Sequence, residues 1–218
     1  MMLEYDKDNK ERLPYEYYIE QYAKADPIEI ANRLEIPYDL KTKRFMLSFL
    51  GSNYYFTWPD LSVSSESKDE IYNPFEKEIF PKVLVLRYLL YATTFSPNGE
   101  FRSYRELPSG ELYYRQFQGR CIFRLNRKYG SRLETFEKVM NALGAAYVHA
   151  GDMAYEVELF ENLYIRFILW AGDEEFPASS QILFSSNFPA AFGTYDLAEI
   201  GDICISTFSE IEKIIEKN

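Results

Sequence analysis

The sequence has a single histidine and two cysteines among its 218 residues. One imidazole rules out every poly-histidine metal site and most general-base schemes. Two thiols without a Cys-x-x-Cys pair cannot assemble a ligand set for zinc or an iron–sulfur cluster. No nucleophile motif accompanies His149, so we interpret it as a surface residue. Cys121 and Cys204 are expected to be buried free thiols, which is typical of a reducing cytoplasm.

Positive charge is also scarce. The 24 Lys and Arg residues face 34 Asp and Glu residues, which gives a net charge of −10. Nucleic-acid binding needs a basic surface that releases counterions, and anionic membranes attract basic segments. We therefore expect neither nucleic acid nor a membrane as a partner. The basic residues within 124–132 are interpreted as the solvated side of a helix and its following turn.

Long apolar runs and common cofactor motifs are missing as well. The longest apolar run, Val83–Thr94, is interrupted by Arg87 and is too short to span a bilayer. The first residues, MMLEYDKDNKERL, contain no apolar signal core, so a cytoplasmic location is expected. No G-x-G-x-x-G, P-loop or G-x-S-x-G pattern occurs. The sequence thus names no cofactor and leaves open whether the protein is an enzyme.

Alternating apolar residues are present over 153–184, and we expect the rest of the chain to be organised around them. Met153–Leu159 and Leu163–Trp170 both alternate with a period of two, which predicts paired antiparallel strands with one wet face. A one-residue slip would turn the apolar set outward. We therefore predict a three-residue loop, Phe160-Glu161-Asn162, that pairs Leu159 with Leu163 and places Glu156 opposite Arg166.

Start and stop signals predict the other elements. A hairpin with Gly51-Ser52 as a type II′ turn is expected near residue 50, and Ser131-Arg132-Leu133-Glu134 is typical of a capping box. The expected helices are Leu13–Lys24, a short helix opened by Asp26-Pro27, one begun by Asn73-Pro74, the nearly all-apolar Lys82–Thr93, Gly110–Tyr129, Leu133–Leu143 and a last helix from Asp196.

These elements predict an α+β fold, since strands and helices do not alternate in a βαβ rhythm. We expect a single domain with a mostly antiparallel sheet of about five strands and helices packed on it. Within it, residues 1–40 are predicted to form an N-terminal helical segment and residues 41–218 the main α+β domain.

Two stretches combine aromatic and acidic side chains at the end of a predicted strand. The run 170–177 carries three consecutive carboxylates after Trp170, and a charge run at this position is commonly a solvated turn. The functional alternative is that carboxylate oxygens hold a hard cation or act as an acid–base pair. If Trp58 and Asp60 meet this turn, they would complete a pocket. The candidate ligand-binding residues are Trp58, Asp60, Asp152, Trp170, Asp173, Glu174 and Glu175.

The same stretches resemble a known family. The run Gly51–Phe56, the Pro59-Asp60 pair, the Gly151–Ala154 turn and, above all, the Trp-x-Gly-Asp-x-Glu-Phe-Pro core that starts at Trp170 are similar to a domain of unknown function found chiefly in anaerobic prokaryotes. The resemblance covers about residues 40–198. It implies a cofactor setting, since some members are associated with iron–sulfur or corrinoid proteins, but it transfers no catalytic residue. Ser185 stands where the family tends to have an acid.

Three functions fit these observations. The first is a small-ligand or cofactor-binding domain, or one that docks on a redox partner, because the usual catalytic side-chain sets are missing. The second is a carboxylate-based hydrolase-like enzyme with Mg²⁺. The third is a protein–protein interaction domain whose amphipathic helices form a homodimer or larger homo-oligomer.

Overall fold

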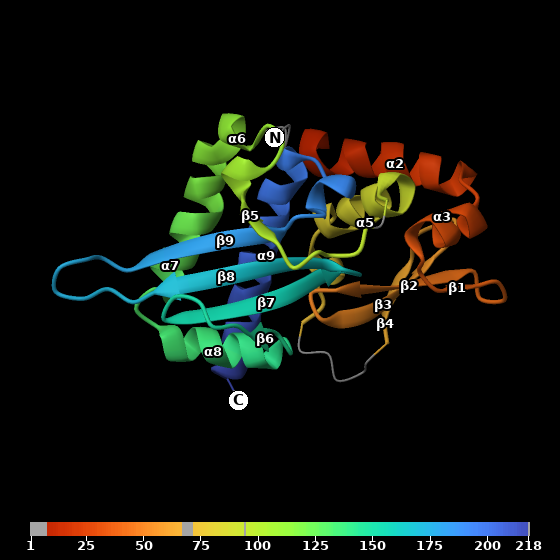
Figure 1. The fold of residues 1–218 in the computed structure, drawn as a ribbon. Coiled ribbons are helices and arrows are strands. Elements are labelled where there is room, and N and C mark those ends of the chain that lie inside the picture. The colour runs from red at the N-terminus through yellow and green to blue at the C-terminus, as the bar shows by residue number, and fades with distance from the viewer. Residues whose placement is uncertain (1–7, 67–71, 94, 218) are drawn as a thin grey trace, which may run out of the picture. The chain divides into compact units, whose positions relative to one another are not determined.

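The computed structural model describes residues 8–66, 72–93 and 95–217, and the chain divides into two compact units (Figure 1). Unit 1 comprises Met1–Leu47, Asn53–Thr94 and Ala190–Phe192, and unit 2 comprises Ser48–Ser52, Phe95–Pro189 and Gly193–Asn218. Helices accompany two antiparallel sheets, which confirms the predicted α+β class. We predicted an N-terminal helical segment over 1–40 and a main domain over 41–218. Whether these parts fold independently is not tested by the division into units, so this stays a prediction.

Unit 1 is built on a four-stranded sheet with the order β1-β2-β3-β4. The strands are β1 (Tyr38–Asp39), β2 (Arg44–Phe49), β3 (Ser52–Thr57) and β4 (Val63–Ser65). The helical elements are the π-helical η1 (Asp8–Arg12), α2 (Leu13–Lys24), α3 (Pro27–Leu34), α4 (Pro74–Lys77) and α5 (Phe80–Tyr91), and the 3₁₀ turn η4 (Phe188–Ala190) ends in this unit.

The helix starts of unit 1 confirm the sequence signals. The Asp26 carboxylate accepts the N–H of Ile28 at 2.8 Å, and the Asn73 side chain accepts the N–H of Phe75 at 2.9 Å, so both residues cap the helices that follow them. Helix α5 is buried over most of its circumference, as its apolar sequence predicts. The guanidinium of Arg33 donates to the carbonyl oxygens of Leu89 and Ala92 and so satisfies free acceptors at the end of α5.

The hairpin between β2 and β3 is present, but its predicted turn was wrong. The two turn residues are Leu50 and Gly51, with φ angles of 49° and 78°, and positive values at both positions are typical of type I′ rather than II′. A tertiary contact explains the shift, because the N–H of Leu50 donates to the carbonyl of Leu159 at 3.2 Å and the Leu50 side chain is buried. The turn residues 48–52 group with unit 2.

Unit 2 is built on a five-stranded antiparallel sheet with the order β5-β9-β8-β7-β6. The strands are β5 (Phe101–Ser103), β6 (Ala146–Tyr147), β7 (Met153–Phe160), β8 (Leu163–Trp170) and β9 (Ser179–Ser185). The helices are η2 (Tyr104–Glu106), α6 (Gly110–Phe117), the π-helical η3 (Gln118–Ile122), α7 (Phe123–Tyr129), α8 (Leu133–Ala142) and α9 (Thr194–Ile215). The predicted helix Gly110–Tyr129 is thus α6, η3 and α7 in sequence.

The register of β7 and β8 confirms the central sequence prediction. Glu156 pairs with Arg166, and their side chains form an ion pair of 2.7 Å. The predicted pairing of Leu159 with Leu163 was wrong, because a bulge between Glu158 and Phe160 lets Phe160 pair with Leu163. The bulge inserts one residue into β7, so a two-residue turn becomes compatible with the register that the apolar pattern demands.

One face of this sheet carries the core of unit 2, and helices cover it (Figure 1). The ring of Phe208 on α9 lies 4.9 Å from that of Phe167 on β8, and the ring of Phe136 on α8 lies 5.9 Å from that of Tyr155 on β7. The apolar side of α9 is buried from Leu197 to Ile211. Edge-to-face aromatic pairs therefore join sheet and helices.

Two rows of charge tie the helix of η3 and α7 to α9. The basic row is Arg120, Arg124, Lys128 and Arg132, and the acidic row is Glu199, Asp202, Glu212 and Glu216. Arg120 forms a bidentate pair with Glu199, with N–O distances of 2.6 and 2.8 Å. The interpretation of residues 124–132 as a merely solvated helix side was therefore incomplete, since these cations pair with α9.

Glu212 is the most deeply buried member of these rows, with 5% of its side chain exposed. Burial alone would raise its pKa. The hydrogen bonds that Lys128 and Arg132 donate outweigh this effect and hold the pKa below its ordinary value. The hydroxyl of Tyr129 donates a further bond of 3.1 Å. The charged carboxylate is therefore the form that the fold stabilises.

We predict that Glu212→Gln lowers the free energy of unfolding by about 2 kcal/mol at pH 7, because two charge-assisted hydrogen bonds lose their anionic acceptor. The folded pKa of Glu212 lies below the unfolded value of 4.5, so the difference from the parent protein should shrink as the pH falls below 4.5. Urea unfolding at pH 7 and pH 3.5 measures both quantities.

The matched control is Glu16→Gln, which breaks the exposed pair of Arg12 with Glu16 on η1 and α2 and should cost less than about 0.5 kcal/mol. Equal losses for the two variants would contradict the role given to Glu212.

Candidate functional site

The acidic turn predicted as a site lies in the exposed loop between β8 and β9. Residues 171–177 are exposed, and the carboxylate of Asp173 accepts the N–H groups of Glu175 at 2.8 Å and Phe176 at 2.6 Å. These two backbone bonds hold the pKa of Asp173 below its ordinary value. Asp173 therefore organises the loop itself, while the side chains of Glu174 and Glu175 are exposed.

Asp152 and Gly151 fasten the base of this loop. The carboxylate of Asp152 accepts the N–H of Ala171 at 2.8 Å, and its own N–H donates to the carbonyl of Leu169 at 3.0 Å. Gly151 has a φ of +56°, and a Cβ there would lie 2.7 Å from the Leu169 oxygen and 3.3 Å from the ring of Trp170. Asp152 and Trp170 thus lie side by side at the end of β8, as parts of one loop base.

The far side of the loop base is anchored to α7. A Cβ at Gly172 would lie 2.8 Å from the nitrogen of Ala178, so the two ends of the loop approach closely. The side-chain amide of Asn126 donates to the carbonyl of Ala178 at 2.9 Å, and the hydroxyl of Ser180 donates to the carbonyl of Ile122 at 2.8 Å. The motif glycines and aspartates therefore build a fixed loop that rests on a helix.

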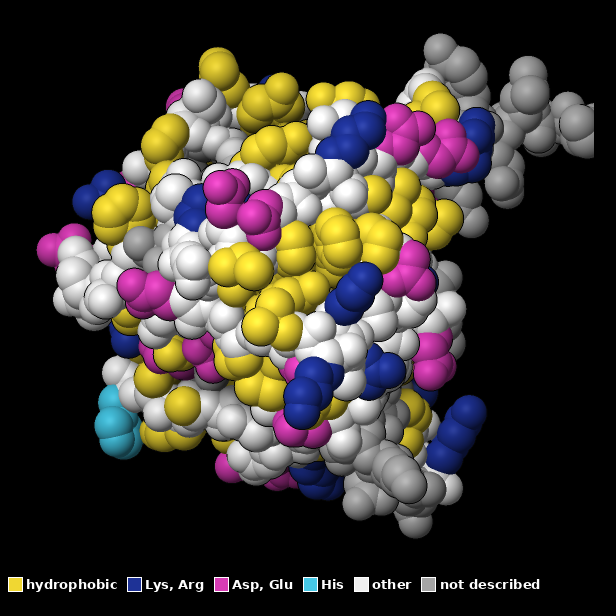
Figure 2. All heavy atoms as spheres, turned by 90° about the vertical axis from the view of Figure 1, so that its right-hand side faces the viewer, with side chains coloured by type: hydrophobic (Ala, Val, Ile, Leu, Met, Phe, Trp, Pro, Cys, Tyr) yellow, Lys and Arg dark blue, Asp and Glu magenta, His cyan; other side chains and the backbone are white. Residues whose placement is uncertain are grey.

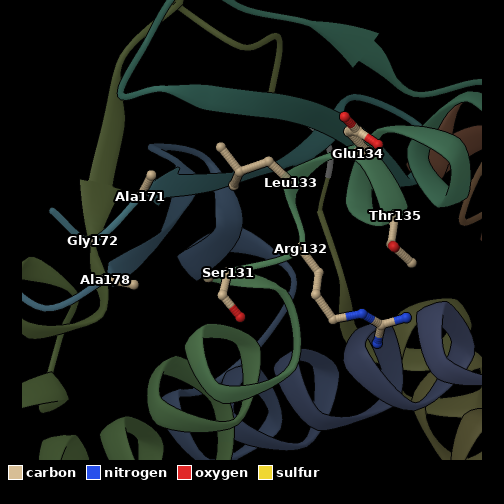
Figure 3. Close-up of a pocket in the computed structure, with 9 residues that line it drawn as sticks. Ser131, Arg132, Leu133, Glu134, Thr135, Ala171, Gly172 and Ala178 are labelled. Atoms are coloured by element: carbon tan, nitrogen blue, oxygen red, sulfur yellow. The ribbon is translucent and has the colours of Figure 1, made fainter.

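A solvent-open depression of about 800 Å³ lies beside this loop base. Figure 3 shows Ala171, Gly172 and Ala178 on one side and the first turn of α8 on the other. The depression is lined by Gly130, Ser131, Arg132, Leu133, Glu134, Thr135, Ala171, Gly172 and Ala178. Its wall therefore combines backbone and small side chains with two hydroxyl groups, one apolar side chain and two charged side chains.

The start of α8 differs from the predicted capping box. The N-cap position is Arg132 instead of Ser131, and its side chain makes no capping hydrogen bond. The guanidinium of Arg132 extends away from Gly172 toward α9 (Figure 3), where it pairs with Glu212 at 2.7 Å and Glu216 at 3.1 Å. The helix thus begins one residue later than a Ser131 cap requires.

The two predicted site residues of unit 1 have their own local partners. The indole N–H of Trp58 donates to the carbonyl of Tyr22 at 3.0 Å, and the ammonium of Lys43 lies 5.6 Å from the ring centroid. The Asp60 carboxylate accepts hydrogen bonds from the hydroxyls of Thr57 and Ser62, which lower its pKa. The other predicted site residues belong to unit 2, so a pocket that joins Trp58 and Asp60 to the acidic turn stays a prediction.

Sequence reasoning missed Ser131, Thr135 and Gly130 as site residues. A weak signal was the Gly130-Ser131 pair at a helix boundary, which we assigned to capping alone.

The surface position predicted for His149 is confirmed, since it is exposed beside the ring of Tyr147. Both cysteines are buried and free, as predicted. Over the described ranges, no group of three or more His, Cys, Asp or Glu side chains is arranged to hold a metal ion.

The fold and this site define an α+β protein with an exposed acidic loop next to an open depression. The chain belongs to the family described as a domain of unknown function, DUF3786, whose model matches residues 26–207. The predicted resemblance to a family of unknown function is thereby confirmed. No curated protein and no solved structure matches the chain. Within the described ranges, no helix has both the length and the apolar character needed to cross a membrane.

We predict that Gly151→Ala destabilises the protein more than Gly144→Ala does. Both glycines have a left-handed backbone, with φ of +56° and +69°, but a Cβ at Gly144 meets nothing within 4 Å. The conformational strain common to both is about 1–2 kcal/mol. The clash of the new methyl group with the Leu169 carbonyl adds about 2 kcal/mol at Gly151.

Urea unfolding of the two variants measures this difference. Equal unfolding free energies would show that the loop base yields to the added methyl group, and that Gly151 is needed only for its backbone angle.

Proposed function

We propose that the protein binds a small ligand in the depression between the loop base of 171–178 and the start of α8. This proposal rests on the observation that Ala171 and Gly172, from the Trp-x-Gly-Asp-x-Glu-Phe-Pro segment of this chain, and the first turn of α8 line the same hollow. Its volume of about 800 Å³ falls within the range of roughly 300–1,000 Å³ that small-molecule sites occupy.

The chemistry of the wall supports binding rather than catalysis. Ser131 and Thr135 contribute hydroxyl groups, the exposed Gly172 leaves backbone accessible, and the N-cap residue of α8 makes no side-chain capping bond. The carboxylate of Asp173 is already engaged by two N–H groups of its own loop. We therefore favour a polar ligand or cofactor held by backbone and hydroxyl groups. Docking of a redox partner at this face, the carboxylate-based hydrolase alternative and a cytoplasmic location stay predictions.

We predict that a ligand of this site raises the melting temperature of the protein in a thermal-shift panel of divalent metals, a corrinoid, haem and nucleotides. A ligand at one hundred times its Kd adds about 2.7 kcal/mol, which corresponds to roughly 5–10 °C for a chain of this size. Ala171→Leu should abolish the shift, because the longer side chain fills the depression.

The matched control is Ala146→Leu on β6, an exposed alanine outside the depression, which should keep the shift. A shift that survives Ala171→Leu would place the ligand elsewhere. A shift with Mg²⁺ alone that survives Ala171→Leu and is lost in Glu174→Gln or Glu175→Gln would favour the hydrolase alternative.

A second candidate function, self-association, rests on a tyrosine patch of α2 and α5 in unit 1. The patch consists of Tyr17, Tyr18, Tyr91 and Arg87. The rings of Tyr17 and Tyr18 are 5.1 Å apart, and those of Tyr18 and Tyr91 are 6.0 Å apart, both edge-to-face. Tyr17 is 56% exposed and Tyr91 is 55% exposed. On the face seen in Figure 2, hydrophobic side chains gather in one continuous area.

The occupant we propose for this patch is the same patch of a second copy. The guanidinium of Arg87 lies 5.4 Å from the centroid of the Tyr18 ring, and tyrosine and arginine are the residues enriched at protein interfaces. Two chains of charge −10 repel each other, so an aromatic patch whose defining residues include a cation and no carboxylate is the favoured place for them to meet.

We predict that the parent protein is a dimer by light scattering and that Tyr17→Ser combined with Tyr91→Ser makes it a monomer. Tyr113→Ser on α6, where the tyrosine is 45% exposed, should leave the mass unchanged. A monomeric parent protein, or a dimer that persists in the double variant, would refute the second candidate without affecting the first.

A further inference from the structure

The side chain of Glu161 lies at the turn between β7 and β8 and is largely buried without full hydrogen bonding. Its Oε1 accepts the N–H of Ser48 at 2.7 Å. Its Oε2 is buried and has no hydrogen-bond partner among the described residues. An ionised carboxylate with an unsatisfied buried oxygen is strongly disfavoured, whereas the neutral acid is tolerated much better. The protonation state of Glu161 therefore bears on what packs against it.

The segment that packs against it is the hairpin tip Ser48–Ser52, which belongs to unit 2. The N–H of Leu50 donates to the carbonyl of Leu159 at 3.2 Å. The rings of Phe49 and Phe160 lie 5.2 Å apart in an edge-to-face arrangement. A Cβ at Gly51 would lie 2.6 Å from the Leu143 carbonyl. The tip is thus closely fitted to the end of β7 and the end of α8.

Charged groups near Glu161 reinforce the cost of ionisation. The tip itself carries no ionisable side chain, so it supplies only the Ser48 N–H. The carboxylate that faces Glu161 is Glu158 on β7, which accepts the N–H of Asn162 at 2.9 Å. Burial, with repulsion from Glu158, raises the pKa of Glu161 to about 6 despite the bond from Ser48. The hydroxyl of Tyr164 on β8 faces Glu158 and stays protonated, since burial also raises the Tyr164 pKa.

We infer that the hairpin tip Ser48–Ser52 is a pH-responsive latch, closed on the β7–β8 turn when Glu161 is protonated and loosened when Glu161 ionises. Docking is strongest below the unfolded pKa of 4.5 and weakens as the pH rises through about 6. A difference of this size between the two states corresponds to a change of up to about thirtyfold in the docking equilibrium.

The test is amide hydrogen exchange followed by NMR, with protection factors for Ser48 and Leu50 corrected for the intrinsic pH dependence of exchange. From pH 4.5 to pH 7.5, the protection of both amides should fall by up to about thirtyfold relative to that of Phe167 in the centre of the sheet. Glu161→Gln keeps the Oε1 acceptor but cannot ionise, so its protection factors should not change with pH. Protection that is constant in the parent protein, or that falls equally in Glu161→Gln, would overturn the latch.

A second measurement keeps the inference falsifiable if Glu161→Gln fails to fold. The side-chain carboxyl carbon of Glu161 is titrated by NMR in the parent protein, together with the amide of Leu50. Both should change with one midpoint near 6, and Glu158→Gln should lower that midpoint by removing the facing charge. A Glu161 midpoint near 4.5, or a Leu50 signal that does not follow it, would refute the coupling.

Discussion

Burial of one face of β7, β8 and β9 under α8 and α9 is the interaction on which the rest of unit 2 depends. The period-two alternation in the sequence places the apolar side chains on this face. The rings of Phe208 on α9 and Phe136 on α8 then pack against aromatic rings of the strands. Apolar burial is not directional, so it does not set how α9 lies along its neighbours. The basic and acidic rows add that direction, because each cation reaches its carboxylates in only one alignment of the helices.

The distinctive motif of the chain is explained in large part by the architecture of a loop. Asp152 and Asp173 each accept hydrogen bonds from backbone N–H groups through one carboxylate oxygen, at distances of 2.6–2.8 Å. Gly151 and Gly172 lie where a Cβ would collide with backbone. These four residues position the loop, and the hollow beside it follows from their packing. The two aspartates that are conspicuous in the sequence therefore hold the loop in place, and neither of them lines the depression beside it.

The sheet was predictable because its signal is local and redundant. The two central strands β7 and β8 are each eight residues long, and the parity of their apolar alternation fixes the pairing of Glu156 with Arg166. The bulge at Glu158 was not predictable, since it changes the turn while leaving that register intact. The turn at Leu50-Gly51 depends on a contact with Leu159, more than one hundred positions away, which no local pattern encodes.

The candidate site was less predictable than the fold for a related reason. Acidic and aromatic side chains are visible in a sequence, and they drew the prediction to Asp173, Glu174 and Glu175. The depression is formed by two segments about forty positions apart, and most of its lining residues are glycine, alanine, serine or threonine, which carry little signal of their own. The start of α8 was mispredicted in a similar way, because the N-cap is Arg132, whose side chain pairs with Glu212 in a distant segment, and not Ser131.

Two glutamates of unit 2 show how position decides the behaviour of one side-chain type. Glu212 and Glu161 are both largely withdrawn from water, yet the pKa of Glu212 is lowered and that of Glu161 is raised. Two cations and a hydroxyl surround Glu212, whereas Glu161 meets only backbone N–H groups and the like charge of Glu158. In a chain with 34 acids and 24 bases, cations cannot be placed beside every carboxylate. The basic row lies along α9, so Lys128 and Arg132 favour the ionised form of Glu212 there, whereas the pKa of the buried acid at the β7–β8 turn is raised.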